Sequence, residues 1–131
     1  MGANSQAVPV PEALAVILAG VGEDLAPHVR RELLNNRLDV AAEFPSATVA
    51  TEALREHRKH RRVIVTRFRS AADEAGLRRL NSALVGWPVV ALVDLDGDPE
   101  NLFRANRAGA AQVVPLPLQP ADFRSALDAV N

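Results

Sequence analysis

The sequence contains no cysteine, a single lysine and no long hydrophobic run. The lack of cysteine excludes a disulfide framework, a cysteine-ligated zinc site and a thiol nucleophile. No apolar run approaches the roughly 20 residues of a membrane-spanning helix, and no basic segment followed by an apolar one opens the chain as in a secretory signal. We therefore expect a cytoplasmic protein without membrane insertion.

An excess of charge of one sign is also missing, since 15 Lys and Arg residues stand against 16 Asp and Glu residues. No overall field therefore steers the chain toward nucleic acid or an anionic membrane. The 131 residues, 48% of them hydrophobic, suffice for one globular domain. We expect a flexible leader over residues 1–11, which are small and polar with two prolines, and one domain over residues 12–131.

Short apolar segments alternate with amphipathic ones along the rest of the chain. Strands are expected at 14–19, 38–44, 63–66, 88–93 and 112–116. Helices are expected at 24–36, from 45 into the basic run 55–62, from 70 to Gly86, at 99–108 and at 120–130. Short strands separated by single helices require parallel pairing and right-handed crossovers. The pattern predicts an α/β, flavodoxin-like (βα)5 three-layer sandwich with sheet order 2-1-3-4-5.

Particular residues mark the ends and buried faces of these helices. Asp24 is predicted to be the N-cap of the first helix. Ser70 and Asp73 have the spacing of a capping box. Val49 and Leu54 are expected to face inward from the second helix. The buried stripe of the last helix is predicted to contain Phe123, Ala126, Leu127 and Val130.

Three segments of the second half carry a family resemblance. Residues 88–92 (PVVAL), 107–110 (RAGA) and 116–118 (LPL) resemble the fourth strand, the Ala-Gly-Ala turn and the Lys-Pro segment of response-regulator receiver (CheY-like) domains. Residues 107–118 also resemble the atypical receiver domain of CpaE/TadZ-like pilus-assembly ATPases, which implies polar localisation and self-association. The resemblance further implies a cis Leu116–Pro117 bond. No P-loop motif occurs, so any ATPase domain is expected beyond Asn131.

The receiver resemblance implies phosphorylation residues that this sequence replaces. Receivers carry an acidic pair after the first strand, an acceptor Asp ending the third, a Ser/Thr ending the fourth and a Lys in the fifth. A carboxylate attacks phosphorus poorly unless Mg²⁺ and cationic donors neutralise the transferring group. We therefore expect no phosphotransfer, no catalysis, no cofactor and no metal site. The corresponding positions here are Ala19 with Gly20 or Gly20 with Val21, then Thr66 or Arg67, Val93 and Leu116.

The sequence also allows two other functions. A shifted alignment would make the chain a phosphoacceptor receiver of a two-component system, with Glu23 and Asp24 supplying carboxylates. A small-ligand or nucleotide-binding flavodoxin-like domain is the other alternative. Residues 20–22 (GVG) open like a dinucleotide fingerprint, but Leu25 stands where the third glycine is needed, which favours a simple tight turn.

Two charged segments are candidates for binding sites. Residues 55–69 hold seven basic residues against one Glu, with Phe68 as the only aromatic residue. Base stacking is poorly supported, so this segment favours a solvated helix end with a protein-docking patch, and we do not expect nucleic acid as a partner. Asp94, Asp96 and Asp98 have the spacing of the first three ligands of a calcium loop, but Gly97 comes two positions early and Ala105 replaces the bidentate Glu. We therefore expect an acidic, solvated loop.

The resemblance also indicates a surface for self-association. Receivers frequently dimerise through the fourth helix, fifth strand and fifth helix. Phe103 lies about 100° around its helix from Leu102, which is expected to face the sheet, so Phe103 is expected to be exposed. The sequence thus predicts a non-phosphorylatable pseudo-receiver that binds a protein partner or itself, within a longer pilus-assembly or regulatory protein. The predicted interface includes Phe103, Arg104, Arg107 and Gln112, and also Phe123 unless core packing claims that side chain.

Overall fold

The computed structural model describes residues 15–56, 61–96 and 98–130, so the leader expected at 1–11 lies outside the described residues. Five strands form one parallel sheet in the order β3-β2-β4-β5-β6. This is the order 2-1-3-4-5 along the chain, which confirms the predicted topology. The strands are β2 (Ala15–Ala19), β3 (Asp39–Phe44), β4 (Val63–Phe68), β5 (Val89–Val93) and β6 (Gln112–Pro115).

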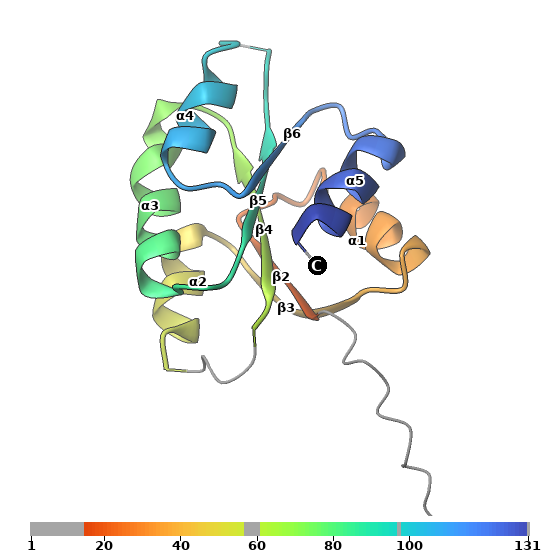
Figure 1. Cartoon of the computed structure of the whole chain (residues 1–131), viewed down its shortest axis with the longest axis horizontal. Helices are drawn as coiled ribbons and strands as arrows, with labels where there is room; N and C mark the ends of the chain where they lie inside the picture. Colours follow the sequence, from red (N-terminus) through yellow and green to blue (C-terminus); the bar gives the residue numbers. More distant parts are fainter. Residues whose placement is uncertain (1–14, 57–60, 97, 131) are drawn as a thin grey trace, which may run out of the picture.

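Helices cover both faces of the sheet and make three layers. Helices α1 and α5 lie on one face, and α2, α3 and α4 lie on the other (Figure 1). Among the helices that the structure describes, none combines the length and apolar character needed to cross a membrane. The helices are α1 (Ala26–Asn35), α2 (Ala47–Leu54), α3 (Glu74–Ala83), α4 (Asn101–Arg107) and α5 (Pro120–Val130), with a 3₁₀ turn, η1 (Ala71–Asp73), before α3.

The core consists of two apolar layers, one on each side of the sheet. Val16 and Leu18 of β2 pack with α1 and α5, whereas Ile17 packs with α2, α3 and α4. All five residues of β5 are buried, as expected for a central parallel strand covered on both faces. Phe123 of α5 is fully buried in the first layer, which confirms its predicted place in the buried stripe of the last helix and excludes it from the exposed interface.

Several predicted helix ends differ from the structure. Leu25, not Asp24, is the N-cap of α1, and no side chain caps that helix. Ser46 caps α2, where its hydroxyl accepts the Val49 N–H, and the valine side chain is 44% exposed rather than inward-facing. The predicted capping box of Ser70 and its Asp partner is confirmed, although it caps η1.

The ends of three other segments also bear on the site. Strand β4 continues two residues past the predicted end and so includes Arg67 and Phe68. Helix α2 ends at Leu54, before the basic run, of which residues 57–60 lie outside the described residues. The Leu116–Pro117 bond is cis, as the resemblance implied.

The burial of Phe123 and the exposure of Phe103 give a matched test of the core. Phe123 is completely buried, whereas Phe103 is 63% exposed. We expect Phe123→Ala to lower the free energy of unfolding by about 3–5 kcal/mol, through lost burial and a residual cavity. Phe103→Ala is expected to change it by less than about 0.5 kcal/mol. Urea denaturation of both variants checks the pair, and equal losses would contradict the placement of these side chains.

Candidate functional site

The side chain of Arg67 lies at the edge of the sheet where the carboxyl ends of β2, β4 and β5 meet. Parallel strands bring these ends together, and ligands of such sheets bind there. Thr66 and Arg67 were the two candidates for the acceptor position. Thr66 is buried, and its Oγ1 donates to the Ala19 carbonyl oxygen at 2.7 Å. Arg67 instead reaches the loops that follow β2 and β5.

The Arg67 guanidinium binds two carboxylates from different loops. Its Nε and Nη2 donate to the two carboxylate oxygens of Asp94, at 3.1 and 3.2 Å. Its Nη1 donates to both carboxylate oxygens of Asp24, each at 3.0 Å, and to the Val21 carbonyl oxygen at 3.3 Å. The planar donor fork of arginine suits such two-point binding. The Arg67 guanidinium therefore joins the β2–α1 loop to the β5–α4 loop.

The pKa values at this cluster follow from the same contacts. The hydrogen bond from Arg67 holds the pKa of Asp24 below its usual range. Partial burial acts to lower the pKa of Arg67, but hydrogen bonds to Asp94 and Asp24 outweigh it and raise that pKa. The Arg67 guanidinium therefore stays charged. The Arg67 side chain is 14% exposed.

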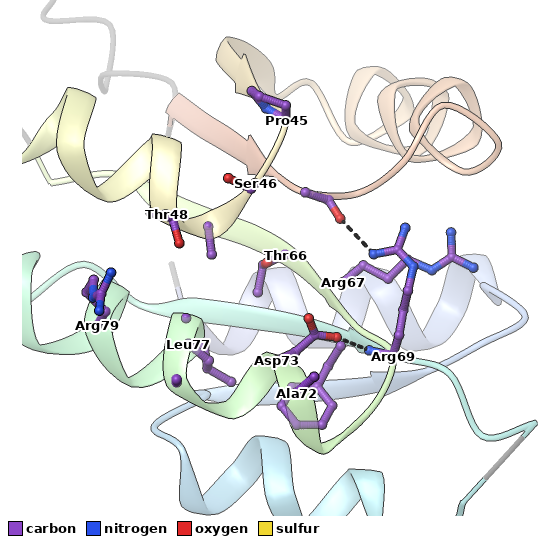
Figure 2. A pocket seen from close by; sticks show the side chains of 15 residues that line it. Pro45, Ser46, Thr48, Thr66, Arg67, Arg69, Ala72, Asp73, Leu77 and Arg79 are labelled. Carbon is purple, nitrogen blue, oxygen red and sulfur yellow. Dashed lines mark hydrogen bonds between the residues drawn. The ribbon is translucent and has the colours of Figure 1, made fainter.

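A second arginine lies beside the first. Arg69 Nη1 donates to the Gly20 carbonyl oxygen at 3.4 Å, and Figure 2 shows the side chains of Arg67 and Arg69 close together. A Cβ at Gly22 would lie 2.8 Å from Arg69 Nη2 and 3.4 Å from Arg67 Nη1. Gly22 also has φ +92°. Glycine therefore suits this position for two reasons: it adopts the positive φ of the turn, and it leaves room for the two guanidinium groups.

The other predicted phosphorylation positions are apolar in the structure as in the sequence. Val21 and Val93 are buried, and Leu116 is half-buried against the α1 and α5 layer. Gly20 donates its N–H to the Phe44 carbonyl oxygen at 2.9 Å. These four positions therefore carry no carboxylate, hydroxyl or amine. In the part of the chain that the structure describes, no three His, Cys, Asp or Glu side chains are grouped as metal ligands.

Asn101 connects the site to α4. Its side chain is almost fully buried, and Nδ2 donates to the carbonyl oxygens of Arg69 (3.0 Å) and Asp94 (3.1 Å). Asn101 Oδ1 accepts from Arg104 Nη1 at 3.0 Å, and the same nitrogen donates to Asp98 at 2.6 Å. That hydrogen bond lowers the pKa of Asp98. Arg104, predicted as an interface residue, is thus held against the β5–α4 loop.

Sequence reasoning missed Asp24, Asp94 and Asn101 as members of this cluster. Asp24 was interpreted as a helix cap, and Asp94 as part of a solvated acidic loop. A usable signal was present, because each Asp follows a strand whose carboxyl end lies beside that of β4. A basic residue ending the strand between two such loops predicts an ion pair across them.

The remaining predicted interface residues lie on α4 and β6, which contact each other. Phe103 is 63% exposed, which confirms the prediction from its helical position. Arg107 is exposed and Gln112 is half-buried. The structure therefore places an aromatic side chain, a cation and an amide on neighbouring surface elements.

The chain has the fold of receiver domains, and comparison with solved structures shows this directly. FixJ-N superposes with a TM-score of 0.73 at 20% identity, over 89% of this chain and 92% of FixJ-N. A protein described as pilus assembly-related from Burkholderia pseudomallei has a TM-score of 0.72 at 19% identity, over 90% and 89% of the two chains. A protein described as the pilus assembly protein CpaE2 from Sinorhizobium meliloti has a TM-score of 0.70 at 19% identity, over 90% and 100%.

These comparisons confirm the predicted receiver-like fold. At this level of identity they establish the fold alone. No protein-family model matches the sequence, and no curated protein matches it.

Removal of the Arg67 guanidinium tests whether it holds the site together. Arg67→Met keeps an apolar stem but leaves Asp94, only 25% exposed, without its cation. We expect the free energy of unfolding to fall by about 1–3 kcal/mol, between the values of exposed and buried ion pairs. Arg31→Met, at an exposed position of α1, is the control and should change it by less than about 0.5 kcal/mol. Equal effects in urea denaturation would show that Arg67 contributes no more than a surface arginine.

Proposed function

We propose that this domain is a receiver-fold interaction module that works without phosphorylation and without catalysis. The observation that carries the proposal is the position of Arg67. The protonated Arg67 guanidinium is a poor nucleophile toward phosphorus, and it occupies both carboxylates that its loops bring to the sheet edge. An ion-paired carboxylate is a weaker nucleophile and a poorer Mg²⁺ ligand than a free one. Val93 and Leu116 offer no donor to stabilise a transferring phosphoryl group.

The solved structures of similar fold support a cellular setting for this module. Several of them are described as pilus assembly proteins. We propose that the domain acts in the cytoplasm as part of a pilus-assembly or regulatory protein, where it binds a protein partner. Its state would then be set by that partner rather than by a phosphodonor.

Incubation with acetyl phosphate and Mg²⁺ tests the loss of phosphorylation. We expect intact-protein mass spectrometry to show no phosphoryl adduct, because neither candidate for the acceptor position is an aspartate: Thr66 is buried and hydrogen-bonded, and the Arg67 guanidinium is paired with carboxylates. A phosphorylatable receiver domain under the same conditions is the positive control. A stoichiometric adduct that is stable in acid and labile in base would contradict the proposal and favour a phosphoacceptor function.

The surface of α4 and β6 supports self-association. Phe103 is a large exposed aromatic side chain, with Arg107 one turn along the helix and Gln112 on the adjacent strand. Aromatic residues and arginines are enriched at the centres of protein interfaces. We propose that this face forms a homodimer contact.

Substitution of Phe103 tests the homodimer. Phe103→Asp should convert a dimer to a monomer in sedimentation equilibrium with little change in melting temperature, because its side chain is 63% exposed. Val85→Asp, at a valine that is 74% exposed after α3, is the matched control and should leave the dimer intact. A wild-type chain that is monomeric at high concentration would contradict self-association through this face.

A further inference from the structure

A groove follows the seam between α2 and α3 on the face of the sheet opposite α1 and α5. Two hollows of about 340 and 460 Å³ lie along this seam, and Arg79 of α3 borders both. Helix α2 lines the first with Ala47 and Thr48, and the second with Thr51, Glu52 and Arg55. The two hollows therefore occupy successive turns of the same pair of helices.

Small residues line part of this α2–α3 groove. The helices approach closely at Gly76, where an added Cβ would lie 3.3 Å from the Cβ of Ala47. Ala72, Ala75 and Ala83 also border the hollows. The first hollow is also lined by Thr66, Phe68 and Leu77, whose side chains are buried.

The described rim of the groove carries the arginines Arg69 and Arg79. Figure 2 shows Arg69 and Arg79 at opposite ends of the first hollow. The Arg69 guanidinium donates to the Gly20 carbonyl oxygen, and among the described residues neither Arg69 nor Arg79 has a carboxylate partner in an ion pair. Both side chains are exposed.

Two carboxylates also border the groove, and both are already bound. Asp73 Oδ2 accepts the backbone N–H groups of Arg69 at 2.6 Å and of Ser70 at 3.3 Å. Glu52 pairs with Arg55 at 3.1 Å. Asp73 keeps its negative charge, because its donors are neutral amides, so two arginines stand against one carboxylate among the described charged residues of the seam that have no ion pair.

The spacing of these arginines suits an extended peptide. Between residues 71 and 79, η1 and the start of α3 advance about 13 Å along the seam, at roughly 2.0 Å per 3₁₀ residue and 1.5 Å per α-helical residue. An extended chain advances about 3.3 Å per residue, so it covers that distance in four to five residues. Carboxylates four or five residues apart on one segment would reach both guanidinium groups.

We propose that the α2–α3 groove binds an extended acidic segment of a partner protein, whose carboxylates pair with Arg69 and Arg79. Nucleic acid fits less well, because two free cations neutralise few phosphates. The only aromatic side chain bordering the hollows, Phe68, is buried and offers no face for base stacking. This surface is separate from Phe103, so failure of the homodimer test leaves it unaffected.

Binding of a fluorescent octaglutamate peptide to the full chain tests the proposal. Fluorescence anisotropy at low ionic strength should show saturable binding that weakens with added salt, while octaglutamine should not bind. Arg69→Gln and Arg79→Gln should each weaken octaglutamate binding about fivefold, the size of one exposed ion pair. Arg31→Gln, on α1 across the sheet, is the control and should bind as the wild type does. Melting temperatures of the three variants confirm that they fold.

Three results would overturn the proposal. The first is a wild-type chain that does not bind octaglutamate. The second is a loss of affinity in Arg31→Gln equal to that in the Arg69 and Arg79 variants, which would mean a diffuse charge effect. The third is octathymidylate binding as tightly as octaglutamate with the same dependence on Arg69 and Arg79, which would assign the groove to nucleic acid.

Discussion

The ion pairs of Arg67 with Asp24 and Asp94 are the interaction on which the functional edge of this domain depends. A parallel sheet gathers the loops after its strands at one edge, and here two of those loops bring carboxylates to the same place. One guanidinium at the end of the intervening strand compensates both. Asn101 extends the connection by hydrogen bonding to the carbonyl oxygens of Arg69 and Asp94, so β4, β5 and α4 are held as one unit.

This arrangement reverses the electrostatics that phosphotransfer needs. A phosphorylation site uses free carboxylates to hold a cation and attack phosphorus. In this chain the cation is the guanidinium of Arg67, a residue of β4. It donates hydrogen bonds to both carboxylate oxygens of Asp94. The receiver fold is retained while the edge becomes a rigid connection.

The fold could be predicted from the sequence, because the apolar strands and helix stripes depend only on local periodicity. The buried residues of β5 and α5 show this clearly. For the site, the sequence predicted only that the phosphorylation residues of receiver domains are replaced, and it did not predict the ion pairs that stand there. The sequence pattern left Thr66 and Arg67 as alternatives, since the choice depends on a side chain's direction at the end of a strand. Asp24 was assigned to a helix cap because local capping preferences do not reveal a competing long-range ion pair.

The most direct test is the titration of the Asp24 carboxyl carbon by NMR, in the wild type and in Arg67→Met. If Arg67 holds Asp24, the wild-type pKa lies below the ordinary Asp value of about 3.9 and returns toward it in the variant. The linked stability is then full above the ordinary pKa and is lost as pH falls through the lowered one. An Asp24 pKa that is the same in both proteins would contradict the account.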